Sequence, residues 1–386
     1  MEPFRIEIPQ ESLDDLAARL AGVRWPVQPV GTGWERGVPV GYLRDLVGYW
    51  RSGYDWRAAE ARLNKFPQFV AEVDGARVHI LHVRSPEPGA VPLVVTHGWP
   101  GSFVEFLEVV GPLADPRGFG GDPGVAFDVV VPTIPGFGFS GPVSGTGWTL
   151  PRVAGVWAEL MRRLGYDRFV VQGGDLGAWI SLTLAGMFPD KVLGAHVNFL
   201  VTPPSGDPAD LAGLSGTELS RLGLLTTYAN ELSGYMKLQT TRPQTLAYSL
   251  TDSPVGQLAW IVEKFKDWTD SASVPEDAVD RDTLLTNVML YWLTGTGATS
   301  AHFYFDNADV MPTAPTPPPP PPPLQVPLGV AVYPRDPAQP IRRFADQGFP
   351  NIVHWAEYDR GGHFPALEVP DLFVEDLRQF ARALPR

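Results

Sequence analysis

The chain has 386 residues, of which 44% are hydrophobic and 19% charged, so it can bury a sizeable core in two or three domains or in one large decorated domain. Its net charge is −13 and it has no run of five or more basic residues, which argues against nucleic acids and anionic membranes as partners. The lack of cysteine excludes disulfides, thiolate nucleophiles and cysteine-bound metals.

The ends of the sequence and its apolar runs bear on location. No apolar stretch approaches the ~20 residues that a helix needs to cross a bilayer. The first 20 residues are acidic and amphipathic, unlike a signal peptide. We therefore expect a cytoplasmic protein with no membrane contact.

Helix and strand patterns alternate through the first half. Residues 12–20 and 42–50 read as amphipathic helices, the first capped by Ser12. A hairpin is predicted over 69–83, with Asp74-Gly75 as its turn. Further strands are predicted at 92–98, 127–132 and 169–172, with helices between them, one of them at 150–165. Strands separated by helices at these distances predict a mostly parallel sheet flanked by helices.

The second half changes character. Residues 201–311 show helical patterns and no clear strand, which indicates an inserted helical cap. Seven consecutive prolines, 317–323, favour a polyproline II rod, here read as a stiff connector from cap to sheet rather than as an SH3-type ligand. Strand patterns resume at 328–334 and 352–359. The predicted division is 1–68 (an extension wrapping the core), 69–200 (core, first part), 201–323 (cap and connector) and 324–386 (core, second part).

A glycine-rich turn, "GGDLG" at 173–177, follows the strand at 169–172. Gly173 and Gly177 match the G-x-S-x-G elbow, which raises a nucleophile at the end of a sheet, but the central residue is Asp175. Asp175 could simply cap the next helix. The flanking glycines favour a strained elbow instead, and the helix N-terminus stabilises the ionised carboxylate.

A carboxylate at this position suits attack on an sp³ carbon, which gives an alkyl ester. Hydrolysis of that ester needs a general base and an oxyanion hole. His363, on the glycine-rich loop after the last strand, is the predicted base, while His354 within that strand is expected to be structural. Asp336, after the preceding strand, is the predicted orienting acid; Asp359 competes, and a solvated loop aspartate is the plain alternative.

The oxyanion donors are predicted to be the backbone N–H groups of Leu176 and of Trp99 in "HGWPGS". A cis Trp99–Pro100 bond would suit so tight a loop, and His97 is expected to be structural. No metal or cofactor site is expected, since the chain has no H-E-x-x-H motif and two other histidines lie on opposite faces of a strand. These are His79 and His82; His302 is expected to line the cap.

Together these features resemble the microsomal-type epoxide hydrolases of the α/β-hydrolase fold, over nearly the whole chain. The resemblance implies that fold, with an inserted helical cap and an N-terminal helical extension. It is carried by "RWP" (24–26), "DWRAAEARLNKFPQF" (55–69), "THGWPGS" (96–102), "PTIPGFGFS" (132–140), "GGDLG" (173–177), "SGYMKLQTTRPQT" (233–245), "DSPVGQLAWIVEKF" (252–265), "LLTNVMLYWLTGT" (284–296) and "RGGHFPALEVP" (360–370).

The resemblance also implies roles: Asp175 as nucleophile, His363 as base and Asp336 as orienting acid, with no cofactor. Two cap tyrosines, Tyr235 and Tyr304, are implied to bind and protonate the epoxide oxygen. A phenol of pKa ≈ 10 can donate to a developing alkoxide without being ionised at neutral pH. The expected partners are a small epoxide and water, and a homodimer is left open. Three more cap tyrosines are expected to be core packing: Tyr228, Tyr248 and Tyr291.

The chain departs from the family in four respects. Leu176 stands where the family usually has Trp, which changes the pocket wall, and Asp336 stands where some relatives have Glu. The membrane anchor of the animal members is expected to be absent. The polyproline run is not a recognised family feature.

The predicted function is conversion of a bulky or aryl epoxide to a vicinal diol, in secondary metabolism or detoxification. A haloalkane or haloacid dehalogenase is one alternative, but it would need halide donors rather than two phenols. A silent ligand receptor on the same fold is another. Such receptors commonly lose a triad member, whereas this chain retains all three.

Overall fold

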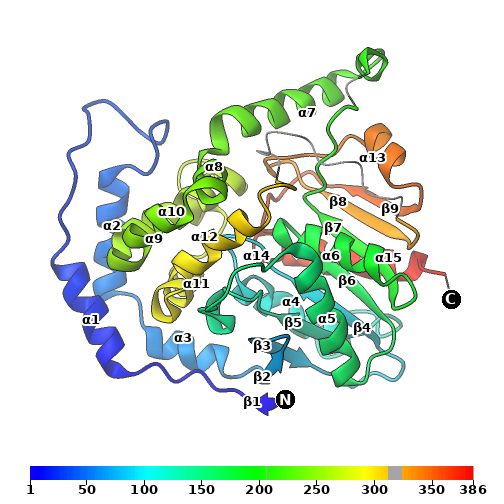
Figure 1. The fold of residues 1–386 in the computed structure, drawn as a ribbon, viewed down its shortest axis with the longest axis horizontal. Helices are drawn as coiled ribbons and strands as arrows, with labels where there is room; N and C mark the ends of the chain where they lie inside the picture. Colours follow the sequence, from blue (N-terminus) through cyan, green and yellow to red (C-terminus); the bar gives the residue numbers. More distant parts are fainter. Residues whose placement is uncertain (206, 312–323, 386) are drawn as a thin grey trace.

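A single sheet forms the centre of the protein in the computed structural model, which describes residues 1–205, 207–311 and 324–385 (Figure 1). Within these residues nine strands pair in the order β1-β2-β3-β5-β4-β6-β7-β8-β9. Their bounds are β1 Glu2–Pro3, β2 Gln68–Val73, β3 Ala76–Val83, β4 Val91–Thr96, β5 Phe127–Pro132, β6 Phe169–Gly173, β7 Val192–Asn198, β8 Leu328–Val332 and β9 Ile352–Glu357. The predicted proline rod at 317–323 lies outside the described residues.

The sheet is antiparallel from β1 to the β3–β5 pair and parallel from β5 to β9. Its central strands are almost wholly buried and apolar, as strands covered by helices on both faces must be. This confirms the predicted mostly parallel sheet. The predicted hairpin is also present. Asp74 and Gly75 both have positive φ, 49° and 75°, as a two-residue hairpin turn requires.

Helices cover the sheet, and a second group of helices forms the cap. The core helices are α4 Leu107–Ala114, α5 Leu150–Leu164, α6 Leu176–Met187, α13 Arg342–Gly348, α14 Pro365–Glu368 and α15 Pro370–Ala383. The cap helices are α7 Gly216–Thr227, α8 Gly234–Thr241, α9 Pro243–Asp252, α10 Pro254–Trp268, α11 Arg281–Thr294 and α12 Thr296–Asp306. The described residues between β7 and β8 contain no strand, which confirms the predicted helical cap.

Three N-terminal helices, α1 Gln10–Ala21, α2 Val40–Ser52 and α3 Trp56–Leu63, flank the cap on the side away from β7–β9 (Figure 1). Helix α2 and the turn after it contact α11 directly. The Trp50 indole N–H donates to Met289 Sδ at 3.3 Å, and the hydroxyls of Tyr54 and Thr286 lie 3.0 Å apart. The N-terminal region therefore supports the cap from outside.

The predicted cap of the first helix is wrong. Helix α1 begins at Gln10, directly after Pro9, and has no side-chain cap. The Ser12 N–H already donates to the Pro9 carbonyl at 3.1 Å, so Ser12 lies inside the first turn. The cause is Pro9, whose fixed φ of −58° lets the chain enter a helix at once.

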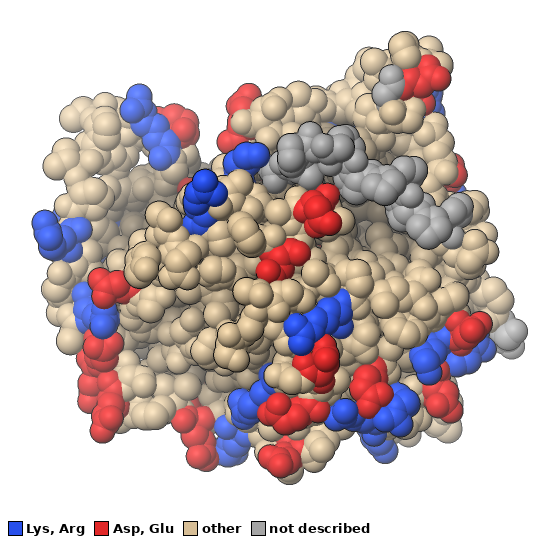
Figure 2. Space-filling view, in the orientation of Figure 1, with Lys and Arg blue, Asp and Glu red and all other residues tan. Residues whose placement is uncertain are grey.

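Two surface properties complete the description. No helix among the described residues combines the length and the apolar character that crossing a bilayer demands. On the face shown in Figure 2, basic side chains are interspersed with acidic ones, most densely along the lower edge.

Candidate active site

Asp175 lies on a strained turn between β6 and α6. Its φ is 51° and its ψ is −127°, a conformation that non-glycine residues rarely adopt. Close packing permits only glycine on either side: a Cβ on Gly173 would lie 2.2 Å from the Gly177 backbone, and one on Gly177 would lie 2.0 Å from Thr96 O. The Asp175 side chain makes no cap hydrogen bond to α6. The turn therefore presents the carboxylate outward, as a nucleophile elbow does.

The structure brings together the three residues of the predicted triad. His363 Nε2 lies 3.6 Å from Asp175 Oδ2, and His363 Nδ1 lies 3.0 Å from Asp336 Oδ1. All three side chains are buried. The loop carrying His363 is attached to the cap, because the His363 backbone N–H donates to Trp268 O on α10 at 2.8 Å. The competing acid, Asp359, is not the one that binds the imidazole.

The charge state of His363 depends on its two carboxylate neighbours. Burial alone lowers the pKa of His363, but Asp336 and Asp175 outweigh it and raise the pKa to about 10. The imidazole is therefore protonated at neutral pH as long as the Asp175 carboxylate keeps its charge. Removing the charge of Asp175 would lower this pKa and release His363 as a base.

The loop after β4 supplies one predicted oxyanion donor. The Trp99 backbone N–H donates to Asp175 Oδ1 at 2.9 Å, and the Trp99–Pro100 peptide is cis. The two carboxylate oxygens are therefore distinct: Oδ1 is held by a backbone donor and Oδ2 is closer to His363. Leu176, the other predicted donor, is the buried first residue of α6.

Both predicted cap tyrosines pack against Trp99. The Tyr235 ring on α8 stacks on the indole with centroids 5.0 Å apart and an interplanar angle of 10°. The Tyr304 ring on α12 meets it edge-on at 6.0 Å and 84°. The Tyr304 hydroxyl is buried and has no hydrogen-bond partner among the described residues.

Both phenols are held in the neutral, donating form. Burial, and next Tyr228, raise the pKa of Tyr235 well above its usual range. Burial, and next the charge of Asp175, do the same for the pKa of Tyr304. Each hydroxyl can therefore donate a hydrogen bond at neutral pH.

Of the three other cap tyrosines expected to be core packing, Tyr228 and Tyr291 are buried in the core and Tyr248 is not. Tyr228, on the π-helical turn Tyr228–Leu232, is buried, and its hydroxyl lies 2.9 Å from that of Tyr235, so it belongs to the site. The spacing of seven residues between these two tyrosines, about two helical turns, was a signal for this contact. The Tyr291 hydroxyl donates to Gly101 O at 2.7 Å and ties α11 to the loop after β4. Tyr248 is 70% exposed, so the packing expectation is wrong there.

Most remaining histidines make structural contacts. The Nδ1 and Nε2 atoms of His79 lie 2.9 Å from Thr133 Oγ1 and Gln68 Oε1. His97 Nε2 accepts from the Ile134 N–H at 3.2 Å, which ties the loops after β4 and β5 together.

One His/Asp cluster among the described residues has ligand atoms close enough for a metal: His196, His354 and Asp376. Sequence analysis did not anticipate it, because its members lie on β7, β9 and α15. The two imidazoles already bind the two oxygens of Asp376, at 2.6 and 2.7 Å.

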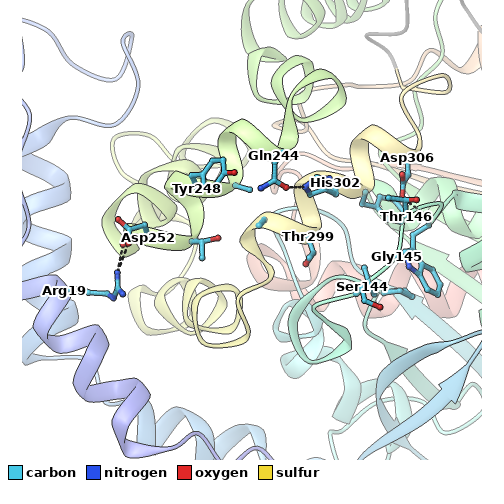
Figure 3. A pocket seen from close by; sticks show the side chains of 17 residues that line it. Arg19, Ser144, Gly145, Thr146, Gln244, Tyr248, Asp252, Thr299, His302 and Asp306 are labelled. Atoms are coloured by element: carbon cyan, nitrogen blue, oxygen red, sulfur yellow. Dashed lines mark hydrogen bonds and ion pairs between the residues drawn. The ribbon is translucent and has the colours of Figure 1, made fainter.

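Two cavities bear on the site. A groove of ≈ 890 Å³ lies between α9, α12 and the loop at 143–148, and Figure 3 shows Gln244 and His302 bonded across it. Phe303 lines this groove, but none of the predicted catalytic residues does. Beside Asp175 and His363 there is a cavity of only ≈ 10 Å³. An epoxide does not fit there, and no cap residue that the structure describes lines this cavity.

Comparison with known proteins gives concordant results. The sequence matches the family described as "Epoxide hydrolase N terminus" over residues 1–106 and the "alpha/beta hydrolase fold" family over 91–208. A protein of Stigmatella aurantiaca that carries a provisional epoxide hydrolase name is 45% identical over 99% of this chain and 85% of that protein. Epoxide hydrolase 1 of Sus scrofa is 34% identical over 98% of this chain and 88% of its own length.

Solved structures show the same relationship. The Aspergillus niger epoxide hydrolase superposes with a TM-score of 0.87 at 31% identity, covering 100% of this chain and 96% of that one. The juvenile hormone epoxide hydrolase of Bombyx mori gives a TM-score of 0.88 at 30% identity, covering 99% and 94%. With its elbow, cap and N-terminal helices, the chain belongs to the microsomal-type epoxide hydrolases of the α/β-hydrolase fold and is an epoxide hydrolase.

Proposed function

We propose that the enzyme converts its epoxide to a diol through a covalent ester on Asp175. One observation carries this proposal. The strained turn aims Asp175 into the site with Oδ1 held by the Trp99 N–H at 2.9 Å and Oδ2 3.6 Å from His363. The oxygen nearer the base is thus the one left to attack. Helix capping, the plain use of such an aspartate, is not what its side chain does.

In the first step Asp175 Oδ2 attacks an epoxide carbon and the ring C–O bond breaks. The released electron pair forms an alkoxide, which takes a proton from the Tyr235–Tyr304 pair. A buried hydrogen-bond donor aimed at a developing oxyanion stabilises that charge strongly, because little water competes for it. The unpaired hydroxyl of Tyr304 is free for this role.

In the second step a water molecule attacks Cγ of the ester and gives a proton to His363 Nε2. The developing oxyanion on Oδ1 is bound by the N–H groups of Trp99 and Leu176. The Cγ–Oδ2 bond then breaks, and His363 returns its proton to the leaving diol oxygen. The other water proton passes from the new Asp175 carboxyl group to His363, which restores the resting charges of the site.

Esterification itself prepares His363 for this step. The free Asp175 carboxylate is one of two charges that raise the pKa of His363 to about 10. An ester carries no charge, so the pKa of His363 falls once the intermediate forms. The imidazolium then gives its proton to the phenolate left by the first step, so His363 becomes a free base only when there is an ester to hydrolyse.

We further propose an aryl epoxide as the substrate class. Aromatic rings surround the nucleophile, and several of them contact one another. They include Trp99, Trp268 and Tyr235. Stacking of a substrate ring against such side chains adds to the burial of its area.

Phenyl glycidyl ether is therefore expected to be a better substrate than cyclohexyl glycidyl ether. The two epoxide groups are equally reactive, so the comparison isolates the aromatic ring. One stacking contact predicts an advantage of about 2- to 12-fold in kcat/KM. Steady-state diol formation measures it, with propylene oxide as the control that carries only a methyl group. Equal or greater kcat/KM for the saturated ring would contradict the aryl assignment.

A further inference from the structure

The ≈ 10 Å³ cavity beside the triad has the size of one water molecule. Asp175 and His363 line it. Glu105, Gln172 and Asn198 line it as well. The proposed mechanism needs a water molecule within reach of these first two residues, and this cavity provides the room.

Two oxygen atoms of the lining residues have no hydrogen-bond partner among the described residues: Glu105 Oε1 and Gln172 Oε1. Both side chains are more than nine-tenths buried, with exposures of 8% and 1%. The Gln172 amide is oriented, because its Nε2 donates to Asn198 Oδ1 at 3.0 Å. Unpaired buried oxygens are costly, and a water molecule between them would remove that cost.

The backbone makes room for the Glu105 carboxyl group. A Cβ on Gly101 would lie 1.5 Å from Glu105 Oε1, so only glycine at this position admits the carboxyl group. Burial raises the pKa of Glu105 to about 8, against the lowering effect of His363 and with a further increase from Asp175. At neutral pH the group is therefore mostly a carboxylic acid, which can donate a hydrogen bond as well as accept one.

We propose that Glu105 is a positioning residue that, together with Gln172, holds the water molecule that hydrolyses the Asp175 ester. This inference rests on the proposed ester mechanism. The water gives its proton to His363 Nε2 and its oxygen to Asp175 Cγ, while Glu105 keeps its own proton. Glu105 lies on the 3₁₀ turn Phe103–Phe106 behind the oxyanion loop, so it orients the water without contacting the epoxide.

The test is a single turnover with the ester trapped by acid and quantified by mass spectrometry of the Asp175 peptide. Glu105→Leu is expected to slow ester hydrolysis about 10- to 100-fold, the effect of losing one hydrogen bond in a buried polar site. Ester formation should keep its wild-type rate, so the ester accumulates and kcat and KM fall together. Glu105→Gln keeps a donor and an acceptor and should restore hydrolysis.

Glu108→Leu is the matched control. Glu108 is a nearby glutamate whose half-exposed side chain pairs with Arg62, and its loss should leave both steps unchanged. Gln172→Met removes the other unpaired oxygen, on the β6 side of the same cavity. It should also slow ester hydrolysis selectively, and it tests the proposal if Glu105→Leu does not fold.

Hydrolysis at the wild-type rate, or equal slowing of both steps without rescue by Glu105→Gln, would overturn the proposal. Absence of any trapped ester in the wild-type enzyme would instead remove the ester mechanism itself. The two failures are therefore distinguishable.

Discussion

Replacing His363 with Gln is expected to arrest the enzyme at the covalent ester. His363 is the proposed base and lies buried next to Asp175, and loss of a positioned general base costs about 10²–10⁴ in rate. The cost falls on the hydrolysis step, because a carboxylate nucleophile needs no base to attack. Mass spectrometry of the variant after incubation with phenyl glycidyl ether should show one substrate mass added to the Asp175 peptide.

His302→Gln is the matched control for this substitution. His302 is on α12, and its Nε2 lies 3.1 Å from Gln244 Oε1. It lines the ≈ 890 Å³ groove, which none of the predicted catalytic residues lines. This variant should turn over normally and show no adduct. Unimpaired steady-state turnover of His363→Gln would remove His363 from the mechanism.

The second large effect is expected from the two cap phenols. Tyr235→Phe and Tyr304→Phe should each slow ester formation, by up to about 10²–10³, since each removes one donor to the developing alkoxide. Because one hydroxyl can partly replace the other, the rate of ester formation in each single variant should fall by less than this range. The rate in the double variant should fall further. Ester hydrolysis should change much less, because the alkoxide is already protonated by then.

Tryptophan fluorescence is a suitable signal for this experiment. Trp99 packs against both tyrosine rings and carries the N–H that binds the nucleophile, so alkylation changes its surroundings. Stopped-flow traces give the rates of both steps. Tyr248→Phe, at a 70% exposed position, is the control. Wild-type ester formation in both single variants would mean that something else binds the epoxide oxygen.

The epoxide hydrolase activity of the family leaves the dehalogenase and receptor alternatives without support. Nothing in the site favours either. The phenols that argue against halide binding lie near the nucleophile, as the resemblance implied.

The sequence was most informative where chemistry depends on local chain geometry. The strand, the glycine pair and the helix around Asp175 are contiguous, so the elbow could be predicted from one short motif. His363 and Asp336 followed from their positions after successive strands, because parallel strands place their carboxyl ends at one edge of the sheet. The cap tyrosines had no such local geometry, and only the resemblance singled them out.

What the sequence could not supply was contact between distant segments. Glu105 reads as an ordinary residue on an amphipathic turn, and only the fold places it behind the oxyanion loop against Gly101. The predicted Ser12 cap is wrong for a local reason, because Pro9 lets the helix begin at Gln10.

The central claim is that Asp175 supplies an oxygen atom to the product, and a single turnover in ¹⁸O-labelled water tests it most directly. With enzyme in excess over epoxide, the diol should carry no label, because its new oxygen comes from Asp175 Oδ2. The label should appear instead in the carboxylate of the Asp175 peptide. Diol labelled in that first turnover, with an unlabelled Asp175, would show direct attack by water and contradict the covalent mechanism.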